Sequence, residues 1–273
     1  MCFKRLNALV EEFNVNTKCC VVAILALNVA ISGVSATPLY RNSVASNDLE
    51  FITSQDPSVF ACFRYLGERT QEMPGHPSDE LMANGVFTYE ITFEDGVTTQ
   101  AWVHYDIGSE DAARVLVQQL GPRFGRIPTV MRREVGHIVI HAGDEAAFAE
   151  DRGKFFVLYA DNMATRIANN DLEETLFHES IHVAFDLDHA NSRQWRQAQQ
   201  ADADFVTAYA ASHPEQEDLA ESALFAYTMI KHPNRLPATV EQAVSQIMPH
   251  RYAYLENLFA GPNFTQVGPE PSC

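Results

Sequence analysis

Residues 171–186 have the sequence Asp-Leu-Glu-Glu-Thr-Leu-Phe-His-Glu-Ser-Ile-His-Val-Ala-Phe-Asp, which combines a helical pattern with the most specific motif of the chain. Apolar side chains recur throughout the stretch, which predicts a largely buried helix. His178 and His182 are four residues apart, so they share one helix face, where both imidazoles can reach one Zn²⁺. Glu179 is offset toward a water bound to that ion. The motif therefore predicts a zinc hydrolase site.

A catalytic zinc takes a third protein ligand and keeps one position open for water. Asp188 and His189 follow the second histidine closely and are alternative ligands. To bring them to the metal the chain would have to turn at residue 185 in a left-handed conformation that suits glycine, and this position holds Phe185. Glu217 is the preferred candidate, because Glu217 and Glu221 share a helix face one turn apart. In that arrangement Glu217 binds the metal and Glu221 orients a ligand imidazole. The other interpretation of these two glutamates is a solvated helix face.

The segment Glu217-Asp-Leu-Ala-Glu221 matches the Glu-x-x-Ala-Glu string of gluzincin-type metallopeptidases, and the chain resembles their lethal-factor-like group in particular. The resemblance implies that Glu217 is the third zinc ligand and that a tyrosine shortly before it faces the metal. Tyr209 lies eight residues before Glu217, one more than that pattern expects. In one interpretation the Tyr209 hydroxyl hydrogen-bonds a developing oxyanion. In the other, the tyrosine side chain packs at the end of a helix. Residues 195–222 are also similar to a little-characterised set of secreted proteins regarded as zinc peptidases.

The remaining pattern predicts an α+β fold. Strands come first and helices afterwards, and the resemblance implies a zincin-like arrangement: an N-terminal, mostly antiparallel sheet with helices, then a helical C-terminal half that carries the metal site. His137 and His141 alternate on one predicted strand and are expected to pack or to lie at the surface. The predicted strands are 86–93 and 98–105, joined in a hairpin by Glu94-Asp95-Gly96, and 135–141 and 155–159; the predicted helices are 110–120, 171–185, 192–211, 214–230 and a pair within 238–259.

The N-terminal region has the layout of a secretory signal peptide. A basic start precedes an apolar stretch, residues 19–31, and small residues end at Ala36, the predicted cleavage site. This predicts a secreted, extracellular protein; the alternative is a protein anchored to the membrane by the uncleaved segment. The predicted divisions are 1–36 signal peptide, 37–58 linker or short pro-segment, 59–262 zinc metallopeptidase-like domain and 263–273 C-terminal tail.

The net charge limits the classes of partner, and the cysteines allow one disulfide bond. The net charge of −17 repels phosphates and anionic lipids, so we expect no nucleic-acid partner and no stable membrane association once the signal is cleaved. Cleavage would leave Cys62 and Cys273 in an oxidising compartment, where they either form one disulfide or stay unpaired. The predicted partner is a peptide or protein substrate.

These features predict a secreted zinc metallopeptidase, a metalloendopeptidase that hydrolyses peptide bonds with a zinc-bound water activated by Glu179. An extended peptide could add as a further strand to 135–141 or 155–159, one of which is expected to form the sheet edge beside the helix. Two alternatives remain open: a secreted zinc-binding module without turnover, and a zinc hydrolase that acts on a non-peptide amide or ester.

Overall fold

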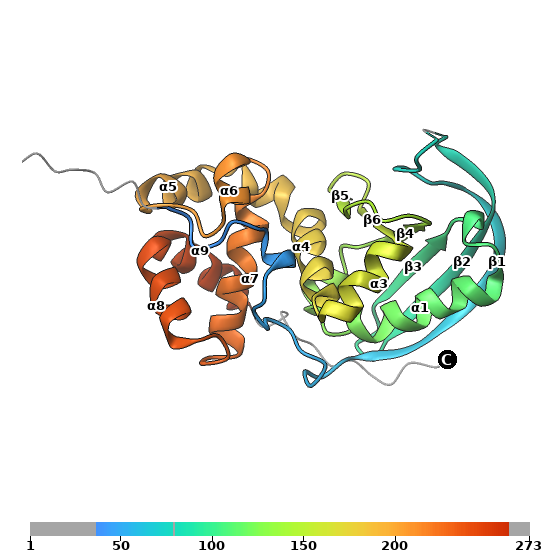
Figure 1. Ribbon diagram of the computed structural model, residues 1–273, viewed down its shortest axis with the longest axis horizontal. Coiled ribbons are helices and arrows are strands. Elements are labelled where there is room, and N and C mark those ends of the chain that lie inside the picture. The colour runs from blue at the N-terminus through green and yellow to red at the C-terminus, as the bar shows by residue number, and fades with distance from the viewer. Residues whose placement is uncertain (1–36, 79, 262–273) are drawn as a thin grey trace, which may run out of the picture. The chain divides into compact units, whose positions relative to one another are not determined.

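The computed structural model describes residues 37–78 and 80–261 of the 273-residue chain (Figure 1). Its described part contains a mixed six-stranded sheet followed by a helical C-terminal half, which confirms the α+β class. The strands are β1 (Phe60–Glu72), β2 (Met82–Phe93), β3 (Thr98–Val103), β4 (His137–His141), β5 (Phe148–Glu150) and β6 (Phe155–Tyr159). The α-helices are α1 (Glu110–Phe124), α2 (Thr129–Arg132), α3 (Ala160–Asn169), α4 (Leu172–Phe185), α5 (Arg193–Ala201), α6 (Ala208–Ser212), α7 (Asp218–Lys231), α8 (Ala238–Ile247) and α9 (Pro249–Phe259). Three short helical turns, η1 (Val44–Ser46), η2 (Tyr105–Ile107) and the π-helical η3 (Asp186–Ala190), complete the set.

The strand order of the sheet is β1-β2-β3-β4-β6-β5. β1, β2 and β3 pair antiparallel, β3, β4 and β6 pair parallel, and β5 pairs antiparallel with β6. The predicted hairpin turn between β2 and β3 is present, with Gly96 at φ +79°. The expected sheet edge was wrong, because both β4 and β6 lie inside the sheet. The polar stretch after β4 folds back as β5, and β5 forms the edge.

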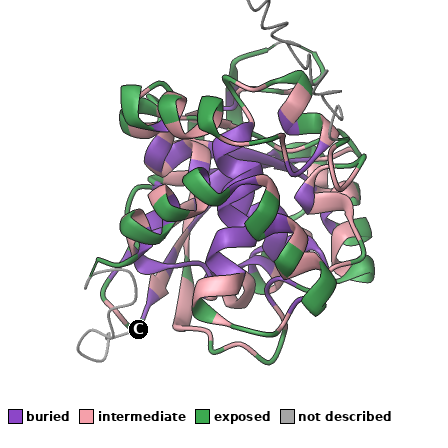
Figure 2. Cartoon of the chain, turned by 90° about the vertical axis from the view of Figure 1, so that its left-hand side faces the viewer, coloured by how far each residue is buried: buried purple, intermediate pink, exposed green. Residues whose placement is uncertain are grey.

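α4 occupies the middle of the fold. Figure 1 shows α1 and α3 beside the sheet, and α4 between the sheet and helices α5 to α9. α4 contacts β5 and β6 on one side and α7 on another. Both α4 and α7 are buried along most of their length, and the buried residues gather at the centre of the cartoon in Figure 2. A predominantly apolar helix of this kind suits such a central position.

Two helix boundaries in the C-terminal half differ from the expected ones. α7 begins at Asp218 and not at Pro214, because the Pro214 carbonyl accepts hydrogen bonds from the side chains of Arg196 and Gln199. Those bonds hold the preceding turn outside the helix. The helix expected over 192–211 is divided into α5 and α6, with a non-helical segment between them.

Other differences lie in the N-terminal half. β1 was not predicted, because three register shifts break its alternating pattern. α1 continues through Gly121 and Pro122 to the buried Phe124, whereas the expected helix ended at Leu120. The short elements α2, α3 and β5 were not predicted either.

Residues 37–58, expected to be a linker or pro-segment, pack against the helical half. Phe51 is fully buried and meets Phe225 of α7 edge-on, with ring centroids 4.9 Å apart. Tyr40 stacks on the same ring at 5.7 Å. Asp56 pairs with Arg235 at 2.5 Å. The packed fold therefore begins before residue 59, and removal of this segment as a pro-segment stays a prediction.

The predicted signal peptide, 1–36, and the predicted tail, 263–273, lie outside the described residues. Cys62 is disulfide-bonded. Its partner lies outside the described residues as well, so pairing with Cys273 stays a prediction. None of the helices that the structure describes is long and apolar enough to span a bilayer.

Candidate metal centre

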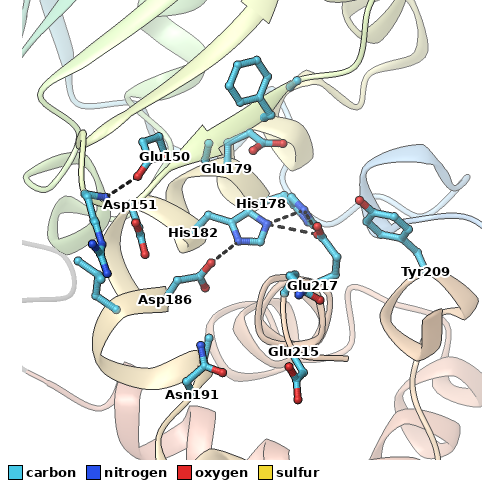
Figure 3. A pocket seen from close by; sticks show the side chains of 17 residues that line it. Glu150, Asp151, His178, Glu179, His182, Asp186, Asn191, Tyr209, Glu215 and Glu217 are labelled. Atoms are coloured by element: carbon cyan, nitrogen blue, oxygen red, sulfur yellow. Dashed lines mark hydrogen bonds and ion pairs between the residues drawn. The ribbon is translucent and has the colours of Figure 1, made fainter. Parts of the chain in front are cut away.

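Three donor atoms from two helices converge at one point. His178 and His182 project from α4, and Glu217 is the residue immediately before α7 (Figure 3). The Nε2 atoms of the two histidines are 3.1 Å apart, and Oε2 of Glu217 lies 3.2 Å from Nε2 of His178 and 3.4 Å from Nε2 of His182. All three residues line a cavity of about 620 Å³. The structure thus brings the preferred ligand set together.

The spacing of these atoms fits a small metal ion. A tetrahedral zinc with bonds of about 2.0–2.1 Å holds its ligand atoms about 3.3 Å apart, the separation found here. Two neutral imidazoles cannot satisfy each other when both present a lone pair, so a cation between them resolves the contact. His178, His182 and Glu217 therefore form a buried group that could hold a metal ion.

Each histidine has a carboxylate behind it. Nδ1 of His182 lies 2.7 Å from Oδ2 of Asp186, one turn further along the chain. Nδ1 of His178 lies 3.4 Å from Oε1 of Glu221, which is fully buried on α7, and has no closer hydrogen-bond partner among the described residues. A proton on each Nδ1 leaves both Nε2 lone pairs free to bind a metal.

Glu221 also anchors the N-terminal segment to the site. The Ser43 hydroxyl donates to Oε1 at 2.5 Å, and the Val44 amide donates to Oε2 at 3.0 Å. The Thr207 hydroxyl, which also caps α6, donates to Oε2 at 2.7 Å. Glu221 is therefore a fully bonded carboxylate that joins three segments at the His178 side of the centre.

The electrostatics show an excess of negative charge around the two imidazoles. Burial raises the pKa of Glu217, but His178 and His182 outweigh burial and hold that pKa well below its ordinary value. Burial lowers the pKa of His182, but Asp186 and Glu217 outweigh it and raise the pKa well above its ordinary value. The carboxylates of Asp186 and Glu217 thus favour a positive charge among the three side chains. A divalent cation bound by neutral imidazoles supplies that charge.

Glu179 lies beside the three donors with its carboxylate facing the cavity (Figure 3). It is 6% exposed, and no described residue donates a hydrogen bond to it. Burial raises its pKa, and the nearby imidazoles oppose that rise. A buried carboxylate of this kind can take up and release a proton.

Tyr209 stands on the other side of Glu217. It belongs to α6, lines the same cavity and is 37% exposed. Figure 3 shows its hydroxyl pointing toward Glu217. Burial and the Glu217 carboxylate raise the pKa of Tyr209, so the hydroxyl keeps its proton at neutral pH. The one-residue difference in spacing thus still leaves the ring at the cavity.

Asp188 and His189 lie elsewhere. Both belong to η3, and neither is among the described residues that line the cavity. Nδ1 of His189 instead lies 2.6 Å from the hydroxyl of Tyr254 on α9. The structure therefore does not bring the alternative ligands to the two histidines.

The wall opposite α7 comes from the hairpin of β5 and β6. Lys154 in its turn donates to the carbonyl of Val183 on α4 at 3.0 Å, which ties the hairpin to the helix. Among the described lining residues, one arginine, Arg152, faces many carboxylates. These are Glu150, Asp151, Glu179, Asp186, Glu215 and Glu217.

Sequence reasoning missed Asp186 and Ser43. Asp186 had a local signal, because it stands four residues after His182 and so shares its helix face. Ser43 had none, because it meets Glu221 across 178 residues of chain. The contact depends on the packing of the N-terminal segment.

Comparisons with protein-family models, with curated proteins and with solved structures find no match to this chain. The functional argument therefore depends on the geometry of the site.

Proposed function

We propose that the chain is a zinc-dependent metallopeptidase. The observation that carries the proposal is the convergence of His178, His182 and Glu217 on one point of an open cavity, with Glu179 beside them. Two imidazoles and one carboxylate are a ligand set of catalytic zinc sites. The three donors leave a coordination position for water or substrate, which supports turnover over a closed structural site.

The residues divide the chemistry among them. A bound zinc ion would lower the pKa of water toward about 7 and polarise the scissile carbonyl. Glu179 accepts a proton from the attacking water and delivers it to the leaving amine. Asp186 and Glu221 hold the two imidazoles in the orientation that directs Nε2 at the ion. The Tyr209 hydroxyl donates a hydrogen bond to the carbonyl oxygen as negative charge develops on it.

The edge strand β5 supports an extended peptide as the substrate. β5 pairs with β6 on one side only, and Phe148, Ala149 and Glu150 all line the cavity. A peptide added along β5 would satisfy free backbone groups of the edge and lie beside α4. This favours a peptide over a small amide or ester.

We also propose that the protein acts outside the cell. The signal-peptide pattern of residues 1–36 supports secretion, and the disulfide at Cys62 supports an oxidising compartment. With a net charge of −17, the partners are peptides or proteins and not nucleic acids or anionic membranes. Retention of the N-terminal segment as an anchor is the alternative.

The test combines metal analysis with a peptide-library digest of the purified protein. We expect one zinc at this centre, cleavage that a chelator abolishes, and recovery on adding zinc. Glu217→Ala should lose tight zinc binding, whereas Asp188→Ala should keep it. Bound zinc without cleavage of any library peptide would indicate a binding module or a hydrolase of non-peptide bonds. Full zinc affinity in Glu217→Ala would contradict the ligand assignment.

A further inference from the structure

A second group of three histidines lies at the carboxyl ends of β3 and β4. His104 follows β3, His141 ends β4, and His76 belongs to the loop between β1 and β2. One ring nitrogen from each lies within 4.8 Å of the other two. The ring centroids are 4.3 Å apart for His76 and His104, and 5.2 Å and 5.3 Å apart for the pairs that include His141. The group shares no residue with the centre on α4.

His141 presents a buried lone pair with nothing to bind. Its side chain is fully buried, and Nε2 lies 2.9 Å from the carbonyl oxygen of Pro74, a contact that only an N–H can make. The proton is therefore on Nε2, and Nδ1 is a free acceptor. No hydrogen-bond partner of Nδ1 exists among the described residues. A metal-binding histidine commonly has this form, with one nitrogen bound to a carbonyl and the other directed at the ion.

The loop that carries His76 is fixed against the sheet. Besides the bond from His141 to Pro74, the Tyr159 hydroxyl donates to the carbonyl of Gly75 at 2.6 Å. Gly75 has φ +83°, and a Cβ there would lie 2.7 Å from the ring of Phe148. The backbone before His76 therefore approaches the sheet more closely than another residue would allow. His76 is thereby placed over the ends of the strands.

A carboxylate stands beside the rings. Oδ2 of Asp106 lies 2.9 Å from Nε2 of His76 and 3.4 Å from Nδ1 of His104. Nδ1 of His76 lies 2.7 Å from the Ser78 hydroxyl. Both nitrogens of His76 thus have partners, and Nδ1 of His104 accepts a hydrogen bond from the Asp106 amide at 3.3 Å. Metal binding through these nitrogens would exchange one of these contacts. Asp106 supplies negative charge next to three imidazoles, which favours a cation among them.

Burial favours the neutral form of His104 and His141. Burial lowers the pKa of His104 and of His141, and it outweighs Asp106, which raises the pKa of His104, and the Pro74 carbonyl, which raises the pKa of His141. Neutral imidazole is the form that binds metal ions. One nitrogen from each ring lies within 4.8 Å of the other two, and the ligand atoms of a tetrahedral zinc lie about 3.3 Å apart, so at most a small movement of the rings brings the three nitrogens to one ion. His76, which is partly exposed on its loop, is the ring with room to move.

We propose that His76, His104 and His141 form a second metal site, which binds a divalent transition-metal ion of the zinc class. Three imidazoles suit zinc and its first-row neighbours, and they exclude the hard ions calcium and magnesium, which require oxygen ligands. The ion joins the β1–β2 loop to the ends of β3 and β4. Its role is structural, and it does not depend on the proposed peptidase activity.

The experiment counts the zinc ions bound to the purified full-length chain after dialysis against a zinc-containing buffer. We expect two ions in the wild-type protein, one in His141→Gln and one in His76→Ala. The control is His137→Gln, because His137 lies on the same strand but stacks between Trp102 and Phe155, with centroids 3.7 Å and 5.0 Å away. It should keep two ions. One ion in the wild-type protein that His182→Ala removes and His76→Ala retains would overturn the proposal.

A second measurement separates metal binding from folding damage. In the His182→Ala background, where the first centre is impaired, zinc should raise the melting temperature of the chain, and His76→Ala should abolish that rise. His76 is the least buried of the three, so its replacement serves if His141→Gln fails to fold. Cobalt added to His182→Ala should give visible absorption bands of a four- or five-coordinate ion. No zinc-dependent rise and no such bands in His182→Ala would overturn the proposal. Failure of the peptidase assay with two zinc ions bound would leave this second site intact.

Discussion

Oδ2 of Asp186 lies 2.7 Å from Nδ1 of His182, so the residue that follows the helix with the two histidines supplies the carboxylate that orients one of them. Asp186→Asn keeps the shape of the side chain but removes its charge. We expect zinc affinity to fall by about 10- to 100-fold, as for other orienting partners of metal-bound histidines. Competition with a chromophoric chelator measures the change. Asp188→Asn is the matched control, and an equal loss in both variants would contradict the assigned role.

Glu221 connects the metal centre to the N-terminal segment through Ser43 and Val44. Glu221→Gln replaces one acceptor oxygen by an NH₂ group that faces a donor, at a cost of about 1–3 kcal/mol in unfolding free energy. Zinc affinity should fall as well, because the amide no longer supports His178. Ser43→Ala, which keeps the carboxylate, should change stability by about 1 kcal/mol and zinc affinity little. Unchanged zinc affinity in Glu221→Gln would show that Glu221 does not orient His178.

Glu174 should make stability depend on pH. Its carboxyl group is 1% exposed, accepts from the amides of Phe51 and Ile52 through one oxygen, and has a second oxygen without a partner among the described residues. Burial raises the pKa of Glu174 from 4.5 to about 8. The folded chain therefore keeps a proton that the unfolded chain loses. This stabilisation is fully present below pH 4.5 and is lost as the pH rises toward 8.

Chemical denaturation at several pH values tests this dependence. Glu174→Gln mimics the protonated form and should lack the loss of stability between pH 4.5 and 8, which for the wild-type residue is on the order of a few kcal/mol. Parallel pH profiles for the variant and the wild-type protein would show that Glu174 is not the group responsible.

The acidic lining of the cavity should set a substrate preference. Glu150, Asp151 and Glu215 line the cavity without a role in the proposed chemistry. We expect peptides with lysine or arginine near the cleaved bond to have lower KM values, and added salt to reduce that advantage. Glu215→Gln should raise KM for such peptides several-fold and leave kcat little changed. Glu256→Gln on the exposed face of α9 is the control, and a preference for acidic peptides would contradict the expectation.

Local periodicity predicted the elements whose environment is regular. β2, β3, β6 and α4 were predicted because apolar residues recur in each of them with the period of a strand or a helix. The bulges of β1 interrupt that period, and β5, with three residues, is too short to show one. The edge strand was misplaced for that reason. α7 was expected too early, because side chains from α5 bind the Pro214 carbonyl across a distance that sequence does not reveal.

The same distinction between local spacing and tertiary packing applies to the residues of the site. His178, Glu179 and His182, and the pair Glu217 and Glu221, lie within single helical turns, so spacing alone predicted how they would face one another. The sequence placed Glu217 with the two histidines through the need for a third ligand and the resemblance, and not through spacing, and in the structure the packing of α4 on α7 joins the two groups. The cluster of His76, His104 and His141 comes from three segments, and His141 was expected only to pack or lie at the surface. Contacts of that kind follow from topology and not from local pattern.

The most direct test of the central claim is the activity of Glu179→Gln with its metal content measured on the same sample. The glutamine keeps the volume of the side chain but cannot accept a proton. We predict full zinc occupancy, an unchanged melting temperature and a loss of peptide hydrolysis of at least about 100-fold. Wild-type hydrolysis by the zinc-loaded variant would contradict the account.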